Sequence, residues 1–307
     1  MTVTLEGGCR VSEMREGDAI VTGTLSIWNR IGRATGAQAI SLRVMEFAPG
    51  ESPTIVNEDC DQILYVLDNL YSVTDRDRVA DRHPLTDHDR VAVEDGSQGQ
   101  AQSAPPLDQV SIDQSHPERV RRTPNPLIRI GESVYEIGAD TGIYIRPNQT
   151  FTIDNPGLDS IIILSAQCPD PDSAPRFVDP LVAASNSSQT DQAPIVRLAD
   201  QKAQPTADRW YRVLIDDRVG STQATQFVGS IPTGRAPDHF HHYEEVLFIL
   251  KGEGRMWAGE SNTPIAQGSC IYLPKGQVHC VENTGEGELR LLGVFYPAGS
   301  PSVRYDA

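Results

Sequence analysis

Short apolar runs separated by turn residues constrain the fold of this chain more than any other feature. These runs are rich in Val, Ile, Tyr and Phe, and many of the 22 Pro and 25 Gly residues lie between them. Such runs are typical of β-strands, and their regular spacing is typical of β-sandwiches and β-barrels. The runs cover residues 38–47, 62–67, 133–138, 142–147, 150–155, 160–167, 209–216, 245–250, 270–274 and 289–296. The sequence therefore predicts an all-β fold.

The two halves of the chain resemble each other. Segment 47–67 (FAPGESPTIVNEDCDQILYVL) and segment 231–250 (IPTGRAPDHFHHYEEVLFIL) each contain a Pro/Gly turn, a polar stretch and an apolar strand with a nearly identical ending. Segment 142–155 (GIYIRPNQTFTIDN) matches segment 270–283 (CIYLPKGQVHCVEN) in the same way. Self-similarity of this kind predicts a tandem repeat of one β-domain.

The repeat predicts where the domains begin and end. A stretch rich in Pro, Ser, Asp and Asn over 165–194 is typical of a crossover between domains. The first copy also carries a charged, apolar-poor surplus at about 71–126, which favours a mobile or partly ordered loop, with a lid or an oligomer contact as alternatives. We predict an N-terminal domain over 1–168, a linker over 169–207 and a C-terminal domain over 208–307.

The charge of the chain limits its partners. A formal net charge of -16 and a pI of about 4.8 would repel a phosphate backbone and an anionic membrane surface. Five cysteines at irregular spacing, with no CxxC, argue against a disulfide framework and against a thiolate zinc site. We expect no nucleic-acid or membrane partner, and reduced thiols.

The location of the protein follows from what the sequence lacks. The segment MTVTLEGGCRVSEMREGD has neither a basic region nor an apolar region of the kind found in signal peptides. No apolar run reaches the roughly 18 residues of a membrane-spanning helix. Cytoplasmic localisation is therefore expected.

Four of the seven histidines lie between residues 239 and 279. Since side chains alternate between the two faces of a strand, His239, His241 and Glu245 share one face, and His279 follows on another predicted strand. Three imidazoles and one carboxylate suit Fe, Mn, Co, Ni, Cu or Zn and leave coordination positions open for a reacting molecule. The alternative is a solvated HFHH turn with an unrelated His279.

The residues around these ligands form two spaced motifs. The first, G-x4-H-x-H-x3-E-x6-G, begins at Gly234 and ends at Gly252, and the second, G-x5-P-x-G-x2-H-x3-N, begins at Gly268 and ends at Asn283. Together they resemble the two sequence motifs of the cupin superfamily, with the first spacer one residue short. Ten matching positions within about fifty residues disfavour the solvated turn.

The resemblance implies two tandem jelly-roll barrels, a bicupin, with an intact metal motif in the C-terminal barrel alone. It assigns one divalent transition-metal ion to His239, His241, Glu245 and His279. In the first copy Gln62 takes the place of Glu245, and Phe151 takes the place of His279. We therefore expect a degenerate, metal-free N-terminal barrel. A homodimer is compatible with the resemblance, because cupins often pair through edge strands.

Four further residues are candidates for weak substrate contacts. Tyr243 and Gln277 share the face of the ligands, whereas Trp257 and Tyr272 come from neighbouring strands. Each of the four has barrel packing as its alternative. His83, His88 and His116 lie in or beside the insertion, where a solvated loop explains them more simply than a metal site.

The motifs leave the reaction open. The first hypothesis is a metal-dependent enzyme for a small organic substrate, either a dioxygenase of quercetinase-like type or an isomerase, decarboxylase or hydrolase that uses the ion as a Lewis acid. The second is a non-catalytic bicupin that binds a small, sugar-like molecule. Cupin barrels host both, so the fold does not decide between them.

Overall fold

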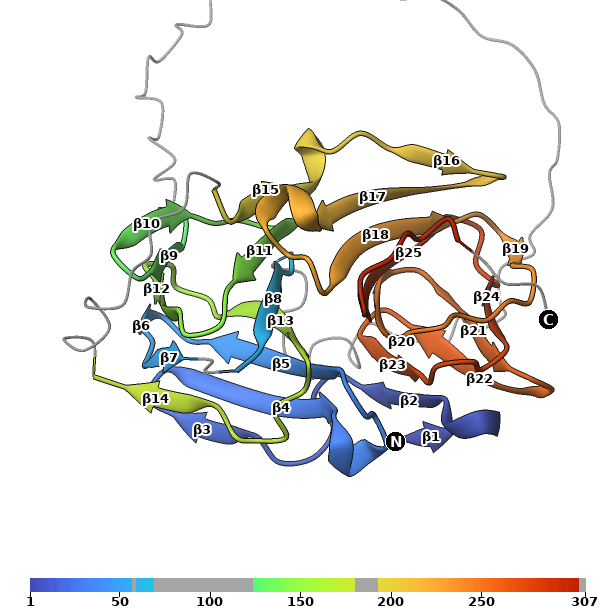
Figure 1. The fold of residues 1–307 in the computed structure, drawn as a ribbon, viewed down its shortest axis with the longest axis horizontal. Helices are drawn as coiled ribbons and strands as arrows, with labels where there is room; N and C mark the ends of the chain where they lie inside the picture. Colours follow the sequence, from blue (N-terminus) through green and yellow to red (C-terminus); the bar gives the residue numbers. More distant parts are fainter. Residues whose placement is uncertain (57–58, 69–123, 180–192, 304–307) are drawn as a thin grey trace, which may run out of the picture. The chain divides into compact units, whose positions relative to one another are not determined.

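The described part of the chain is built from β-strands. The computed structural model describes residues 1–56, 59–68, 124–179 and 193–303, and no α-helix occurs among them (Figure 1). The prediction of an all-β fold is confirmed. Within these ranges no helix has the length and apolarity that crossing a bilayer requires. The insertion expected at 71–126, with His83, His88 and His116, lies outside the described residues except for 124–126.

Two sheets form the N-terminal barrel. Their strands alternate buried and exposed residues or are buried on both faces, as expected for sheets that enclose one core and pack against another. In spatial order the first sheet contains β15 (Ile195–Arg197), β11 (Thr141–Ile145), β8 (Asp61–Val66), β13 (Ile161–Cys168), β5 (Ser41–Phe47), β4 (Leu25–Ile31) and β3 (Ile20–Thr22). The second contains β10 (Ser133–Glu136), β9 (Leu127–Ile130), β12 (Thr150–Asn155), β7 (Thr54–Val56) and β14 (Arg176–Val178), with β6 (Gly50–Glu51) paired to β12.

Two more sheets form the C-terminal barrel. In spatial order the larger contains β1 (Val3–Thr4), β2 (Arg10–Glu13), β23 (Ser269–Leu273), β20 (Glu244–Lys251), β25 (Leu289–Tyr296), β18 (Thr225–Ile231), β17 (Arg209–Ile215) and β16 (Gln204–Thr206). The smaller contains β19 (Gly234–Arg235), β24 (His279–Asn283), β21 (Glu253–Ala258) and β22 (Ser261–Ala266). Short 3-10 turns are described at η1 (Glu6–Gly8), η2 (Arg33–Thr35), η4 (Leu198–Asp200) and η5 (Asp217–Val219).

The repeat predicted from the sequence is present in the strand register. Gln62 of β8 pairs with Ile145, as Glu245 of β20 pairs with Leu273. Asn155 donates through its side chain to the carbonyl of Phe47, the last residue of β5. Asn283 makes the matching bond, 2.9 Å long, to Ile231, the last residue of β18. The chain therefore folds one β-domain twice.

Each barrel is completed by a strand from the other half of the chain. The N-terminal strand β2 pairs with β23 of the C-terminal barrel, and β15 pairs with β11 of the N-terminal barrel. Strand β2, from the first half of the chain, thus belongs to the C-terminal barrel, and β15, from the second half, belongs to the N-terminal barrel. The domain boundaries expected at 168 and 208 stay predictions. Exchange of this kind also covers two sheet edges that would otherwise expose unpaired backbone groups.

The described residues form three apolar clusters, one of which joins the two barrels. One fills each barrel, and a third lies between β4, β5, β8, β11 and β13 of the first barrel and β18, β20, β23 and β25 of the second. In this third cluster Tyr65, Tyr144, Phe248 and Tyr272 are at most 4% exposed. Because this shared core involves both barrels, we expect them to unfold as one cooperative unit.

The strand exchange predicts an effect of Val11 on the C-terminal barrel. Val11 is 5% exposed, belongs to the core of that barrel and lies opposite Ile271. Val11→Ala should lower the free energy of unfolding by about 2 kcal/mol, because it removes two buried methyl groups and leaves a cavity. Val21→Ala is the control, since Val21 is 66% exposed on β3. Equal midpoints of the two variants in urea would contradict the exchanged arrangement.

Candidate metal centre

Backbone hydrogen bonds bring the two histidine motifs together. His239 and His279 form an isolated antiparallel bridge, in which each N–H donates to the other carbonyl, at 3.1 and 2.8 Å. The N–H of Gly276 donates to the carbonyl of His241 at 2.8 Å. Gly276 has a φ of 78°, which glycine adopts at little cost and which lets the chain turn just before His279. The segment before β20 is thereby fixed against the start of β24.

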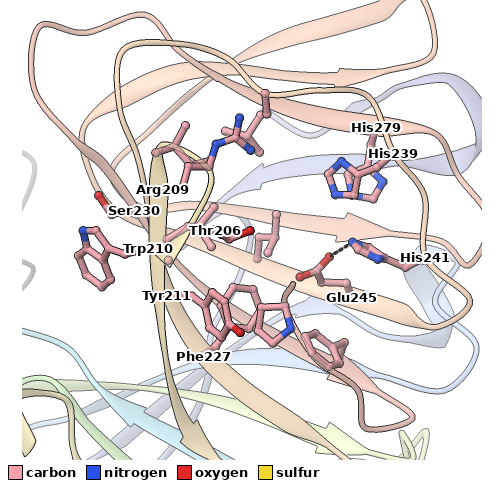
Figure 2. A pocket seen from close by; sticks show the side chains of 18 of the residues that line it. Thr206, Arg209, Trp210, Tyr211, Phe227, Ser230, His239, His241, Glu245 and His279 are labelled. Carbon is pink, nitrogen blue, oxygen red and sulfur yellow. Dashed lines mark ion pairs between the residues drawn. The ribbon is translucent and has the colours of Figure 1, made fainter. Parts of the chain in front are cut away.

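Three imidazoles converge in the barrel (Figure 2). The nitrogen ligand atoms of His239, His241 and His279 lie within 4.8 Å of one another. That spacing encloses a space suited to one ion with bonds of about 2.0–2.2 Å. The carboxylate of Glu245 lies beside the cluster, with Oε2 3.7 Å from Nε2 of His241. The structure therefore brings together all four residues that the sequence singles out as ligands.

Carbonyl groups orient two of the imidazoles. Nδ1 of His239 lies 3.0 Å from the carbonyl of Pro237, and Nδ1 of His279 lies 2.8 Å from the carbonyl of Gln277. A carbonyl accepts only, so each Nδ1 carries the proton and each Nε2 keeps its lone pair. This is the arrangement of histidines that bind metals through Nε2.

Burial sets the protonation of the cluster. Loss of water lowers the pKa of His241 to about 3, with added repulsion from His279 and His239, and lowers that of His279 to about 4. Both imidazoles are therefore neutral near pH 7 and available as ligands without loss of a proton. Burial alone raises the pKa of Glu245 to about 8. A carboxylate that is 5% exposed needs a cation nearby to stay ionised, so this donor set fits a divalent ion.

The cluster lines one end of a cavity of about 120 Å³. Its walls are mainly apolar and aromatic, and the ring of Tyr243 stacks between His241 and Phe295 with centroid distances of 4.6 and 4.4 Å. An engineered apolar cavity of about 150 Å³ holds one benzene molecule, so a molecule of about that size fits here and a larger one would extend out of the cavity.

The residues predicted as weak substrate contacts lie in different places. Tyr243 lines the cavity, but Trp257, Tyr272 and Gln277 are not part of its described lining. Trp257 donates to Glu282 at 2.8 Å, and the hydroxyl of Tyr272 bonds to Glu244. Gln277 contributes its carbonyl, which orients His279. Substrate contact stays a prediction for Tyr243. The cavity lining does not support substrate contact for Trp257, Tyr272 or Gln277.

Strand β17 supplies cavity residues that the sequence reasoning missed. Arg209 and Tyr211 line the cavity, as does Thr206 of β16. Thr206 and Arg209 are directly opposed in the β16–β17 hairpin. Thr206 falls within the stretch expected to be a linker, so no motif pointed to it. Arg209 could have been found from the alternation of RWYRVLID, which places it on the face of Tyr211.

The equivalent positions in the N-terminal barrel carry other groups. Gln62, at the position of Glu245, donates to Oγ of Ser165 at 2.7 Å. Phe151, expected at the position of His279, is 1% exposed in the apolar core. Neutral amide and phenyl groups fill this interior without a buried charge. That the N-terminal barrel binds no metal stays a prediction.

Comparison with protein families decides the superfamily. A model of the Cupin domain matches residues 227–295, which include both histidine motifs. The chain belongs to the cupin superfamily.

An uncharacterized protein of Aquifex aeolicus is 34% identical over 85 residues, which are 27% of this chain and 69% of that protein. Auxin-binding protein 1 of Arabidopsis thaliana is 34% identical over 73 residues, 21% of this cupin chain and 37% of that protein. The oxalate-binding protein of Thermotoga maritima is 36% identical over 58 residues, which are 19% of this chain and 48% of that protein.

Solved structures share the two-barrel fold of this bicupin. A deletion mutant of Bacillus subtilis oxalate decarboxylase superimposes with a TM-score of 0.64 at 11% identity, covering 96% of this chain and 78% of the other. A protein described as glyoxylate-induced, from Pseudomonas aeruginosa, superimposes with a TM-score of 0.63 at 12% identity, covering 98% and 93%. At these identities the likeness shows the fold alone.

The buried carboxylate predicts how stability depends on pH in the metal-free protein. With a folded pKa of about 8 and an ordinary value of 4.5, Glu245 holds a proton in the folded chain that it loses on unfolding. The contribution of Glu245 is therefore complete below pH 4.5 and declines by about 1.4 kcal/mol per unit as the pH rises to about 8. Glu245→Gln should remove this decline in urea titrations at several pH values.

The repeat offers a matched control for this measurement. Gln62→Glu places a carboxyl at the equivalent buried position and should introduce a decline of the same sign. If the metal-free Glu245→Gln variant kept the slope of the unmodified protein, the assignment of the slope to Glu245 would be wrong.

Proposed function

We propose that this bicupin is a metal-dependent enzyme that acts on a small organic molecule in the C-terminal barrel. His239, His241, His279 and Glu245 would hold one divalent transition-metal ion. The observation that carries the proposal is the cluster of three imidazoles, two of them fixed by carbonyls, beside a buried carboxylate at the end of a cavity. A bound ion would supply a Lewis acid or a redox centre with open coordination positions.

The residues of the chain support this chemistry in distinct ways. Contacts between Nδ1 and carbonyl oxygens keep Nε2 of His239 and His279 free of a proton. Ionised Glu245 would add one negative charge and so lower the net positive charge of a bound ion with its ligands. The aromatic rings of Tyr243 and Phe295 would cover part of a bound substrate.

The size of the cavity favours one class of reaction over another. A flavonol is several times larger than benzene and exceeds a space of about 120 Å³, so a quercetinase-like dioxygenase is the weaker candidate. Lyase or isomerase chemistry on a short carbonyl or carboxylate compound fits this volume. The fold likeness to oxalate decarboxylase agrees in substrate size, and as a likeness of fold it carries no further weight.

The first prediction for this proposal concerns metal content. Elemental analysis of the purified protein should find about one equivalent of Mn, Fe, Co, Ni, Cu or Zn, and the His239→Ala/His279→Ala double variant should hold less than about a tenth of that, because half of the ligands are gone. His242→Ala is the matched control, since His242 is exposed and its neighbours on both sides line the cavity. Protein without metal even after reconstitution would overturn the proposal.

The second prediction concerns turnover. The metal-loaded protein should convert at least one two- to five-carbon hydroxy, keto or dicarboxylic acid, and a chelator or His279→Ala should lower kcat by at least about a hundredfold. Proton NMR would follow the substrate while an oxygen electrode records O₂. Conversion without O₂ uptake identifies lyase, isomerase or hydrolase chemistry, and conversion with uptake identifies an oxidase or an oxygenase. A tightly bound compound recovered unchanged would instead identify a binding protein.

A further inference from the structure

We propose that the protein has a second binding site, between its two barrels, which takes an aromatic molecule that carries an anionic group. The site is a cavity of about 840 Å³, within the range of pockets that enclose small organic ligands. Its described lining shares one residue, Tyr243, with the cavity of the histidine cluster. The inference therefore concerns a different site and does not depend on the proposed function.

The strand exchange builds this second cavity. Its lining comes from the N-terminal segment that contains β1, η1 and β2, from the segment around η2 of the first barrel, and from the ends of β20, β23 and β25. Because β2 pairs with β23, the start of the chain forms one wall beside residues that lie more than 250 positions later (Figure 1). The cavity thus exists only where the two halves of the chain meet.

The second cavity lies on the outer face of the larger sheet of the C-terminal barrel. Arg10 of β2 lies opposite Tyr272 of β23, and the hydroxyl of Tyr272 donates to Glu244 of β20, so the three side chains share this face. Glu245, the next residue of β20, points to the inner face and lines the first cavity. One sheet therefore has a cavity on each of its two faces.

The charges in the second cavity favour an anion. Among the described lining residues, those charged at neutral pH are Arg10, Lys275 and Glu244. Both carboxylate oxygens of Glu244 already accept hydrogen bonds, from the backbone N–H groups of Gln38 and Ala39 at 2.9 and 2.6 Å. The carboxylate has little capacity left for a ligand, and the two cations outweigh it. This cavity is thus positive in a chain whose net charge is -16.

Both cations have donors to offer to a ligand. Arg10 uses Nη1 for a hydrogen bond of 2.9 Å to the carbonyl of Thr35, which holds the guanidinium in place. A guanidinium has five N–H donors, so the others remain for an anion. Lys275 is exposed in the turn between β23 and β24, and its ammonium group has no ion pair or hydrogen bond within the described part of the chain.

Aromatic rings supply the apolar part of the second cavity. Four of its eighteen described lining residues are Phe or Tyr, whereas aromatic residues make up 6% of the chain. Phe240 and Tyr296 are partly exposed, so part of each ring can contact a ligand. Flat rings stack on such surfaces, and a negatively charged substituent would reach the cations. An aromatic anion matches both parts of the lining at once.

Binding of naphthalene compounds to the purified protein tests this inference. 2-Naphthoate and 2-naphthyl phosphate have a ring and an anionic group, 2-naphthamide lacks the charge, and acetate lacks the ring. Naphthalene fluorescence would report the affinity of the first three and calorimetry that of acetate. At least one of the two aromatic anions should bind, and the amide and acetate should bind at least about 10-fold more weakly. The two anions distinguish a carboxylate site from a phosphate site.

Variants of the two cations locate the bound anion. Arg10→Gln should weaken its binding by about 10- to 100-fold, and Lys275→Gln by about 2- to 5-fold because Lys275 is exposed. Neither change should affect the amide. Arg10→Lys should retain part of the affinity, which separates loss of charge from loss of structure. Arg255→Gln, at an exposed residue of β21, removes a charge elsewhere and should change nothing.

The His239→Ala/His279→Ala double variant and the chelator-treated protein show which cavity the anion occupies. Affinity should stay within about twofold in both, because the substitutions and the metal belong to the other face of the sheet. Binding that is lost in both of them and kept in Arg10→Gln would place the anion in the first cavity and overturn the inference. It would also be overturned if neither aromatic anion bound, or if the anions and the amide bound alike. None of these results would change the metal content, on which the proposed function depends.

Discussion

The burial of Glu245 among imidazoles is the constraint on which the rest of the C-terminal barrel depends. A carboxylate and two histidines that are 4–7% exposed lie beside apolar side chains of the barrel core. Such groups destabilise a core unless a cation or hydrogen bonds compensate for the lost water. The raised pKa of Glu245 and the lowered pKa values of His241 and His279 result from this loss of hydration, which disfavours the charged form of each group. A metal ion, as proposed, would compensate all of them at once.

The N-terminal barrel supports the strand that carries this carboxylate. Glu244, the neighbour of Glu245 on β20, accepts hydrogen bonds from the backbone N–H groups of Gln38 and Ala39 at 2.9 and 2.6 Å, and from the hydroxyl of Tyr272. The repeat preserves this pairing, because Tyr144 donates to Asp61 at 2.9 Å in the first barrel. The histidine motif differs between the copies, whereas the Tyr–carboxylate contact at the shared core is present in both. The first barrel thus contributes rigidity to β20.

The sequence predicted what depends on local spacing. Parity along one strand predicted that His239, His241 and Glu245 share a face; the three side chains do lie together, but Glu245 alone lies on a strand, β20, and the two histidines lie in the segment before it. The aligned repeats placed Gln62 at the position of Glu245, and the register agrees, because Gln62 lies opposite Ile145 as Glu245 lies opposite Leu273. The exchange of β2 and β15 could not be predicted, because pairing between distant edge strands leaves no periodicity in either segment. Thr206 was missed for the same reason: a three-residue strand in a polar stretch is indistinguishable from a linker. Trp257 shows that a place on a neighbouring strand does not predict a cavity contact, since its indole N–H donates to Glu282 and its ring packs against Arg235, whose Cζ lies 4.1 Å from the ring centroid.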